Sequence, residues 1–395
     1  MNKSIRLLVV DDSALMRKHL VAYLQKDRRI DVIATARDGV DAVDKAIELR
    51  PDVITLDINM PKMDGLTALQ HIMYKAPCPI IILSSLTQKG ALITFEALEL
   101  GAFDFINKPK GTISYDIEGM GKELLNKIYA AADSKGMGKS SMYRTRAKAT
   151  APSSTKSLST NREIGTKSKS AIAKNYLTVD GSRSKGRERE KEVLPAIALP
   201  ERVVLIGVST GGPKTLMDIL PKLPAHFPYP ILLIQHMPAH FTSSFAARLH
   251  KILPMNVIEA RHRQPLEAGT IYLAPGGVHM HVDRPIGRNQ LRLLISEKPA
   301  DRLFKPSVDV TLFSLLKHFP AERIISVLLT GIGDDGAKAM AAVTEQGGCT
   351  IAESEETAIV FGMPKVAAEL GGASKVLPSY EIADEIMREA ARSLI

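Results

Sequence analysis

The sequence predicts an α/β protein made of two doubly wound parallel-sheet domains joined by a flexible basic linker. The chain has 395 residues, and a compact domain takes about 150 on average, so two or three domains are expected. Two parts of the chain alternate short apolar runs with helical patterns, which is typical of parallel strands and the helices that cover them. A long polar stretch separates these parts. We place the first domain at residues 1–125, the linker at 126–198 and the second domain at 199–395.

Four short runs in the first domain have the composition of buried parallel strands. Residues 5–10, 53–56, 80–83 and 103–106 are rich in β-branched residues and nearly continuously apolar. Residues 13–25, after the first run, place apolar side chains at helical spacing. The first domain is therefore expected to be a parallel sheet with helices on both faces.

The basic character of the chain belongs to the linker. The whole chain carries a formal net charge of +9, and residues 134–192 alone contain 15 Lys and Arg against 5 Asp and Glu. That stretch has few large apolar residues to offset the entropy of ordering, so we expect a mobile tether. Basic segments can bind nucleic acid or acidic lipid. Because no aromatic stacking group or recognition motif accompanies this one, no nucleic-acid partner is expected.

Composition excludes several further classes of protein. With 45% hydrophobic and 24% charged residues the chain resembles ordinary globular proteins, and no stretch approaches the roughly 20 apolar residues that cross a bilayer, so no membrane insertion is expected. The N-terminus turns acidic directly after a short apolar run, unlike a secretory signal, so a cytoplasmic location is expected. Cys78 and Cys349 lie far apart in the sequence, which predicts neither a disulfide framework nor a cysteine-rich zinc site.

Functional groups in parallel sheets collect at the carboxyl ends of the strands. In the first domain the polar residues at these positions include Asp11, Asp12, Asp57, Ser84 and Lys108. One such aspartate alone is often only the N-cap of the next helix, but the whole set predicts a functional edge. Three carboxylates favour a bound Mg²⁺. The cation, Lys108 and Ser84 can hold phosphoryl oxygens, which leaves Asp57 to attack phosphorus and form an acyl phosphate.

The motifs DD, VITLDINMPKMDG, IILSS and GAFDFINKP, in this order, resemble the receiver domain of two-component response regulators, a flavodoxin-like fold. The resemblance implies phosphorylation of Asp57, with a chemotaxis histidine kinase as the phosphodonor. The Mg²⁺ ligands that it implies are Asp11, Asp12, Asp57 and the backbone carbonyl of Asn59. The residues that it implies as relays of the modified state are Ser84, Lys108 and Phe105. Ser84 stands where Thr is commoner, which keeps the hydroxyl and changes the packing.

The second domain opens with a run at 203–206 that predicts another buried strand. The GVSTG turn after it fits the pattern GxSxG, with Ser209 at its centre. A serine on a tight strand-to-helix turn exposes its Oγ, as a nucleophile requires. A glycine-rich phosphate loop is the competing interpretation, although the turn lacks the GK[ST] ending of a P-loop and the third glycine of a dinucleotide fingerprint. The motif by itself leaves both open.

A serine nucleophile needs a base and an orienting acid. His236 follows the apolar run 231–234, and the segment after the run 324–329 contains Asp334 and Asp335. A histidine at a strand end is more often only a satisfied polar residue, but the ends of parallel strands share one edge, so these groups can converge on Ser209. The order Ser, His, Asp differs from the Ser, Asp, His order of the α/β-hydrolase fold, so that fold is not expected.

The motifs GVSTGGP, LIQHMP, IYLAPGG, LLTGIGDDGAKAM and IVFGMPKVA resemble the catalytic domain of chemotaxis protein-glutamate methylesterases. The resemblance implies Ser209 as the nucleophile, His236 as the base and Asp335 as the orienting acid, because Asp334 occupies a variable position of the family's TGxGxDG pattern. It also implies the backbone N–H of Ile332 as an oxyanion donor. Isoleucine stands there where methionine is common, which a main-chain role tolerates.

The two resemblances together imply a phosphorylation-activated hydrolase. Its reactions would be removal of methyl groups from glutamate γ-methyl esters of methyl-accepting chemoreceptors and deamidation of receptor glutamines. No cofactor is expected in the esterase domain, since the motif VHMHV offers His279 and His281 without a third His or a Cys. The linker is longer than is usual in the family, which lowers the effective concentration of one domain near the other and favours weaker basal inhibition by the receiver. A phospho-dependent signalling adaptor with a catalytically silent second domain remains the alternative.

Overall fold

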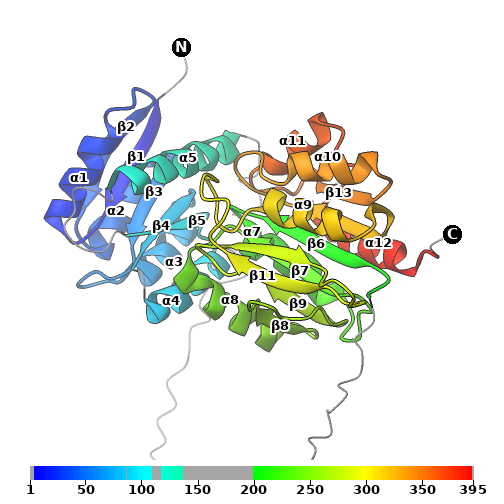
Figure 1. Cartoon of the computed structure of the whole chain (residues 1–395). Coiled ribbons are helices and arrows are strands. Elements are labelled where there is room, and N and C mark those ends of the chain that lie inside the picture. The colour runs from blue at the N-terminus through cyan, green and yellow to red at the C-terminus, as the bar shows by residue number, and fades with distance from the viewer. Residues whose placement is uncertain (1–3, 86, 109–116, 137–198, 394–395) are drawn as a thin grey trace, which may run out of the picture.

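The computed structural model describes residues 4–85, 87–108, 117–136 and 199–393. These residues form two α/β domains with parallel sheets, so the predicted fold class is confirmed (Figure 1). The predicted linker, 126–198, lies outside the described residues from position 137 onward. Its predicted start falls inside helix α5 (Ile117–Gly136), because Leu124, Ile128 and Ala131 continue the buried stripe of that helix.

The first domain is a five-stranded parallel sheet in the order β2-β1-β3-β4-β5. Its strands are β1 (Ile5–Val10), β2 (Ile30–Ala36), β3 (Val53–Asp57), β4 (Ile80–Ser84) and β5 (Asp104–Asn107). Its helices, besides α5, are α1 (Ala14–Leu24), α2 (Gly39–Leu49), α3 (Gly65–Lys75) and α4 (Gln88–Glu99). The predicted runs correspond to β1, β3, β4 and β5. Strand β2 was not predicted, because it lies at the sheet edge and most of its side chains are partly or fully exposed.

The second domain is a seven-stranded parallel sheet in the order β14-β13-β12-β6-β7-β9-β8, with a separate antiparallel pair β10-β11. Its strands are β6 (Val203–Val208), β7 (Ile231–Gln235), β8 (Asn256–Glu259), β9 (Thr270–Leu273), β10 (His279–Asp283), β11 (Arg292–Ser296), β12 (Ile324–Leu328), β13 (Cys349–Glu353) and β14 (Lys375–Leu377). Its α-helices are α7 (Gly212–Ile219), α8 (Ala239–Ile252), α9 (Val308–His318), α10 (Ala337–Glu345), α11 (Met363–Glu369) and α12 (Ser379–Ala391).

The order of these strands fixes where functional side chains can gather. Strand β6 lies at the centre of the sheet, between β7 on one side and β12 on the other. The chain moves outward from β6 through β7 in one direction and returns to the opposite side at β12, so the strand order reverses beside β6. In open parallel sheets the crevice at such a reversal, beyond the carboxyl ends of the strands, is where ligands bind. The segments that follow β6, β7 and β12 carry Ser209, His236 and Asp335.

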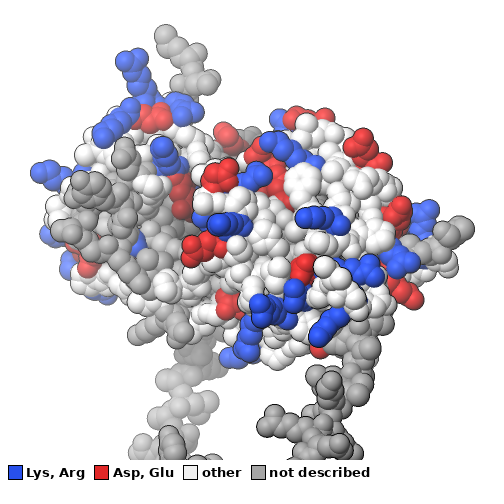
Figure 2. Space-filling model, in the orientation of Figure 1, with Lys and Arg blue, Asp and Glu red and all other residues white. Residues whose placement is uncertain are grey.

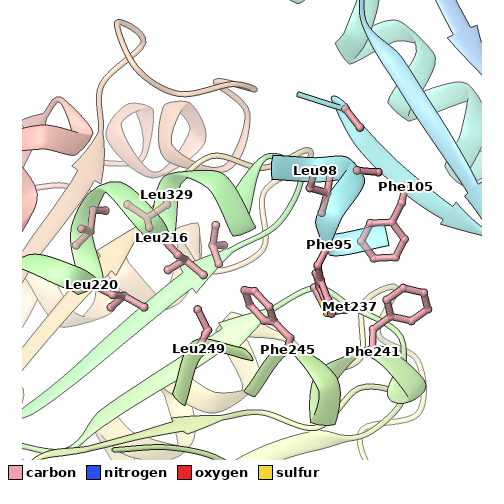
Figure 3. Close-up of a cluster of buried hydrophobic side chains, with 14 of the residues drawn as sticks. Phe95, Leu98, Phe105, Leu216, Leu220, Met237, Phe241, Phe245, Leu249 and Leu329 are labelled. Atoms are coloured by element: carbon pink, nitrogen blue, oxygen red, sulfur yellow. The ribbon is translucent and has the colours of Figure 1, made fainter. Parts of the chain in front are cut away.

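The two domains are packed against each other through an apolar contact (Figure 3). Phe95 of α4 and Phe105 of β5 come from the first domain, and Phe241 and Phe245 of α8 come from the second. The Phe105 and Phe241 rings stack with centroids 4.7 Å apart, and the Phe95 and Phe245 rings stack at 5.1 Å. All four rings are buried, so the docked arrangement removes a substantial apolar surface from water.

Charges of both signs are interspersed on the face shown in Figure 2. That distribution agrees with the near-neutral charge of the chain outside residues 134–192. Among the helices within the described ranges, none is long and apolar enough to cross a membrane.

Candidate active site and phosphorylation site

Ser209 lies at the tight turn between β6 and α7, where it is 8% exposed. Its backbone N–H donates to the carbonyl of Thr330, just beyond β12, at 3.0 Å. Its own carbonyl accepts a hydrogen bond from Nε2 of Gln235 on β7, also at 3.0 Å. The turn requires a glycine at position 212, since a Cβ there would come within 2.2 Å of the Gln235 amide oxygen. Ser209 is thus anchored to both neighbouring strands.

His236 follows β7, and its backbone N–H donates to the Val208 carbonyl at 3.0 Å, which places it across from the end of β6. Nε2 of its ring lies 2.8 Å from Oδ2 of Asp335. The other ring nitrogen, Nδ1, is buried and has no hydrogen-bond partner among the described residues. The structure therefore brings the predicted base and the predicted orienting acid into contact, with Ser209 at the end of the adjacent strand.

The N-terminus of α9 holds the carboxylate of Asp335. Ser307, the N-cap residue, donates its hydroxyl to Oδ1 at 2.7 Å. The backbone N–H groups of Val308 and Asp309 donate to the same carboxylate at 2.7 and 3.2 Å. Burial alone would raise the pKa of Asp335, but hydrogen bonds from His236 and from this helix end outweigh burial and lower that pKa. Asp335 is therefore an anion at neutral pH.

Phe304 covers one face of the His236 ring, and sequence reasoning missed it. The two rings are nearly parallel, at an angle of 9°, with centroids 4.3 Å apart. Phe304 lies three residues before Ser307, so one short segment contacts both the base and the orienting acid. A single phenylalanine in a loop gives no periodic signal, so no pattern along the sequence pointed to this segment.

The segment after β12 packs directly on the nucleophile. At Gly331 a Cβ would lie 2.7 Å from the Cβ of Ser209, so glycine is what permits the close approach. Ile332, the predicted oxyanion donor, is the next residue and is partly buried. Of the two adjacent aspartates that follow, Asp334 is exposed and Asp335 contacts His236.

A second polar site lies at the carboxyl ends of β1 and β3 in the first domain. Asp11, Asp12 and Asp57 place carboxylate oxygens within 4.8 Å of one another, a donor set and spacing that fit Mg²⁺. Lys108 Nζ lies 2.8 Å from both Asp11 and Asp57. Burial raises the pKa of Asp57, and the charge of Lys108 offsets part of that rise. Asn59 is exposed, and its backbone N–H lies 3.4 Å from Oδ1 of Asp57.

Ser84 is close to this site along the sheet, but its hydroxyl contacts a different element. Its Oγ is buried and lies 2.7 Å from Oγ1 of Thr94 on α4. The Thr94 hydroxyl also lies 2.7 Å from the Gly90 carbonyl. Phe105, another residue predicted to relay phosphorylation, is in the contact between the domains. The predicted relay residues Ser84 and Phe105 are therefore directed toward α4 and the second domain.

A polar contact beside Ser209 joins the two domains. Thr210, next to the nucleophile, donates its hydroxyl to Oδ2 of Asp104 on β5 at 2.8 Å. The same oxygen of Asp104 lies 2.9 Å from Nζ of Lys127. Burial alone would lower the pKa of Lys127, but the carboxylates of Asp104 and Glu123 outweigh burial and raise it. This cluster lies beside Ser209, and the side chain of Thr210 is buried.

Comparison with known proteins matches both halves of the chain. Residues 7–114 match the family model of the response regulator receiver domain, and residues 204–386 match that of the CheB methylesterase. A solved structure of the Thermotoga maritima CheB methylesterase catalytic domain is 39% identical, covering 47% of this chain and 97% of that chain with a TM-score of 0.45. The response regulator domain of Thermotoga maritima CheB is 52% identical, covering 33% of this chain and 98% of that chain with a TM-score of 0.32.

Full-length relatives extend the match over nearly the entire chain. A protein-glutamate methylesterase/protein-glutamine glutaminase from Carboxydothermus hydrogenoformans is 48% identical over 383 residues, covering 97% of this chain and 98% of the relative. One from Caldanaerobacter subterraneus is 48% identical over 389 residues, covering 98% of this chain and 97% of the relative. Both resemblances drawn from the motifs are confirmed, and the chain belongs to the protein-glutamate methylesterase/protein-glutamine glutaminase family.

Proposed function

We propose that this protein is a phosphorylation-activated hydrolase of the Ser-His-Asp type that acts on methyl-accepting chemoreceptors. It removes methyl groups from glutamate γ-methyl esters, releasing methanol, and deamidates receptor glutamines to glutamates. The observation that supports this most directly is the contact between His236 and Asp335 beside the strand end that carries Ser209. A base fixed by an ionised acid, next to a serine on a strand-to-helix turn, is the arrangement that acyl transfer needs.

In the proposed reaction Ser209 Oγ attacks the ester carbonyl while His236 takes its proton. Because Nε2 of His236 is bonded to Asp335, Nδ1 is the ring atom left to act as the base. The imidazolium then returns the proton to the departing methanol, or to ammonia in the deamidation. Asp335 holds the ring tautomer and stabilises the imidazolium. Water attacks the glutamyl-enzyme with the help of the same base, which regenerates the serine and releases glutamate.

The developing oxyanion needs hydrogen-bond donors near Ser209. The backbone N–H of Ile332 and those at the start of α7 are our candidates, because Gly331 brings the first segment against Ser209 and α7 begins three residues after it. Donors of this kind are worth on the order of 3 kcal/mol each in related reactions.

The first domain supplies the regulation in this proposal. Asp57 accepts a phosphoryl group from a histidine kinase, and Lys108 neutralises one of its oxygens. Asp11, Asp12, Asp57 and the Asn59 carbonyl would hold the Mg²⁺. When bound, Mg²⁺ neutralises phosphoryl charge during the transfer. In the docked arrangement Asp104 engages Thr210 beside the nucleophile, so movement of β5 or α4 on phosphorylation changes access to the active site.

The decisive experiment measures methanol release from methylated receptor membranes, with and without a small-molecule phosphodonor. Wild type should release methanol faster with the phosphodonor. Ser209→Ala should release none under either condition. Asp57→Asn should keep the basal rate and lose the stimulation. Methanol release that survives Ser209→Ala would reject the serine mechanism, and absence of release by the wild type would favour the silent adaptor.

A further inference from the structure

We propose that Phe304 is a positioning residue that fixes the plane of the His236 imidazole for catalysis. The inference rests on the proposed function, because it assigns His236 as the base. The observation that supports it is the nearly parallel stacking of the Phe304 and His236 rings, whose centroids lie 4.3 Å apart at an angle of 9°.

The ring of Phe304 is itself held in place. The carbonyl of the next residue, Lys305, accepts a hydrogen bond from the Gly277 N–H at 2.9 Å. On another side, a Cβ at Gly333 would lie 3.8 Å from the Phe304 ring edge, so the segment after β12 lies beside it. Ser307, two residues after Lys305, is the N-cap of α9 and donates its hydroxyl to Asp335. Phe304 is therefore part of a segment anchored on both sides rather than a mobile cover.

A single hydrogen bond does not define the orientation of an imidazole. The bond from Nε2 to Asp335 fixes one ring atom, but the ring can still tilt around that contact, which changes the direction of Nδ1. A flat neighbour stacked on the ring face blocks this tilt, whereas a branched aliphatic side chain offers no matching plane. The aromatic ring and the carboxylate together determine the direction of Nδ1.

The kinetic test compares Phe304→Leu with Phe304→Tyr. Leucine keeps apolar bulk and removes the plane, while tyrosine keeps the ring. We expect Phe304→Leu to lower kcat for methanol release about 10- to 100-fold, because misplacement of a catalytic group by a fraction of an ångström costs this much. KM should change by less than about twofold, since the stack acts on the chemical step. Phe304→Tyr should restore kcat to within about threefold of wild type.

Leu303→Ala is the matched control, because Leu303 is the adjacent residue and is 85% exposed. It should behave as wild type. Equal kcat values for Phe304→Leu and wild type would overturn the proposal, and so would a Phe304→Tyr variant as impaired as Phe304→Leu.

A second measurement does not depend on turnover, so it separates failure of this inference from failure of the proposed function. In NMR spectra of histidine-labelled protein, a phenyl ring stacked face-on shifts the His236 ring-proton resonances upfield. We expect this shift in wild type and in Phe304→Tyr, and its loss in Phe304→Leu. His236 resonances that are the same in wild type and Phe304→Leu would reject the stack even if the enzyme proves inactive.

Discussion

The chemistry of single residues in this protein is set by what surrounds them. Asp335 is the clearest case, because its carboxylate accepts hydrogen bonds from an imidazole, a hydroxyl and the end of a helix. These donors lower its pKa despite burial. The ordinary pKa of an aspartate carboxyl group is near 3.8. Because the pKa of Asp335 is lower than this, the group is ionised at that pH and above, and it is protonated only in more acidic solution. The acid is therefore charged at neutral pH.

Asp335→Asn should lower kcat by about four orders of magnitude, the effect of removing the orienting acid from a Ser-His-Asp site. Because Asp335 remains ionised, its own titration should add nothing to the pH profile of the wild-type kcat between about pH 6 and 9. Steady-state methanol release over this range measures it. The neighbouring Asp334→Asn is the matched control and should behave as wild type, since Asp334 is exposed. Loss of activity in the control rather than in Asp335→Asn would contradict the assignment.

Site residues that follow strand ends could be predicted, and those that support them could not. Ser209 and His236 lie within a few residues of apolar runs, and Asp335 follows such a run by six residues, so strand ends pointed to this region. The choice of Asp335 over Asp334 came from the family resemblance. Phe304 and Ser307 act on partners 68 and 28 positions away in the chain, through contacts that exist only after α9 has packed. No local pattern encodes such a distance, so these contacts required the structure.

At the level of elements, helix α4 lies between Ser84, near the proposed phosphorylation site, and the second domain. Thr94, on one side of the helix, meets the hydroxyl of Ser84 in the sheet. Phe95, the next residue, stacks on Phe245 of α8. A change in the position of the Ser84 hydroxyl therefore alters the contact of Thr94, which is the residue next to Phe95 in the domain contact. If Ser84 donates a hydrogen bond to a phosphoryl oxygen on Asp57, as we propose, its hydroxyl would leave Thr94.

Thr94→Val should remove the hydrogen bond between α4 and the Ser84 hydroxyl. The variant loses a buried hydrogen bond worth about 1 kcal/mol, so the released form should become about fivefold more populated without phosphodonor. Basal methanol release should rise accordingly. Thr94→Ser keeps the hydroxyl and should remain near wild type. A basal rate that falls in Thr94→Val, with normal stimulation by phosphodonor, would show that this contact does not restrain the docked form.

The elements themselves were predictable to the extent that they are buried. Strands β1, β3, β4 and β5 are near-continuous apolar runs, and all were anticipated. Strand β2 was not, because an edge position lets polar side chains interrupt the run. The first boundary of the linker was predicted from the change in composition, while α5 continues beyond it because its buried positions extend to Ala131.

For the whole molecule, the family resemblance implied inhibition of the second domain by the receiver, but the residues that form the contact between the domains could not be predicted from the sequence. The aromatic residues of the contact look like ordinary core residues of their own domains. The rings stack across the boundary between the domains (Figure 3). Together with the bond from Thr210 to Asp104, this stacking places the first domain beside Ser209. Length and motifs predicted two domains and a tether, but a contact between separately folded surfaces has no signature along the chain.

Phe95→Ala should loosen this contact, because the ring makes two aromatic contacts with α8, one with Phe241 and one with Phe245. Such contacts are worth about 0.5–1.5 kcal/mol each beyond area burial, so basal methanol release should rise about tenfold or more, up to the phosphorylated rate. Leu92→Ala lies on the same helix at a side chain that is 54% exposed and serves as the control. An unchanged basal rate in Phe95→Ala would mean that docking does not limit the esterase.

The bond between Thr210 and Asp104 also allows the second domain to act on the first. Free-energy coupling between two sites is reciprocal, so if docking and catalysis oppose each other, a receptor segment that occupies the esterase cleft also displaces the receiver. The displaced receiver is then more easily phosphorylated at Asp57. Receptors rich in methyl esters would therefore help to switch on the enzyme that demethylates them, and this help would fade as the esters are consumed.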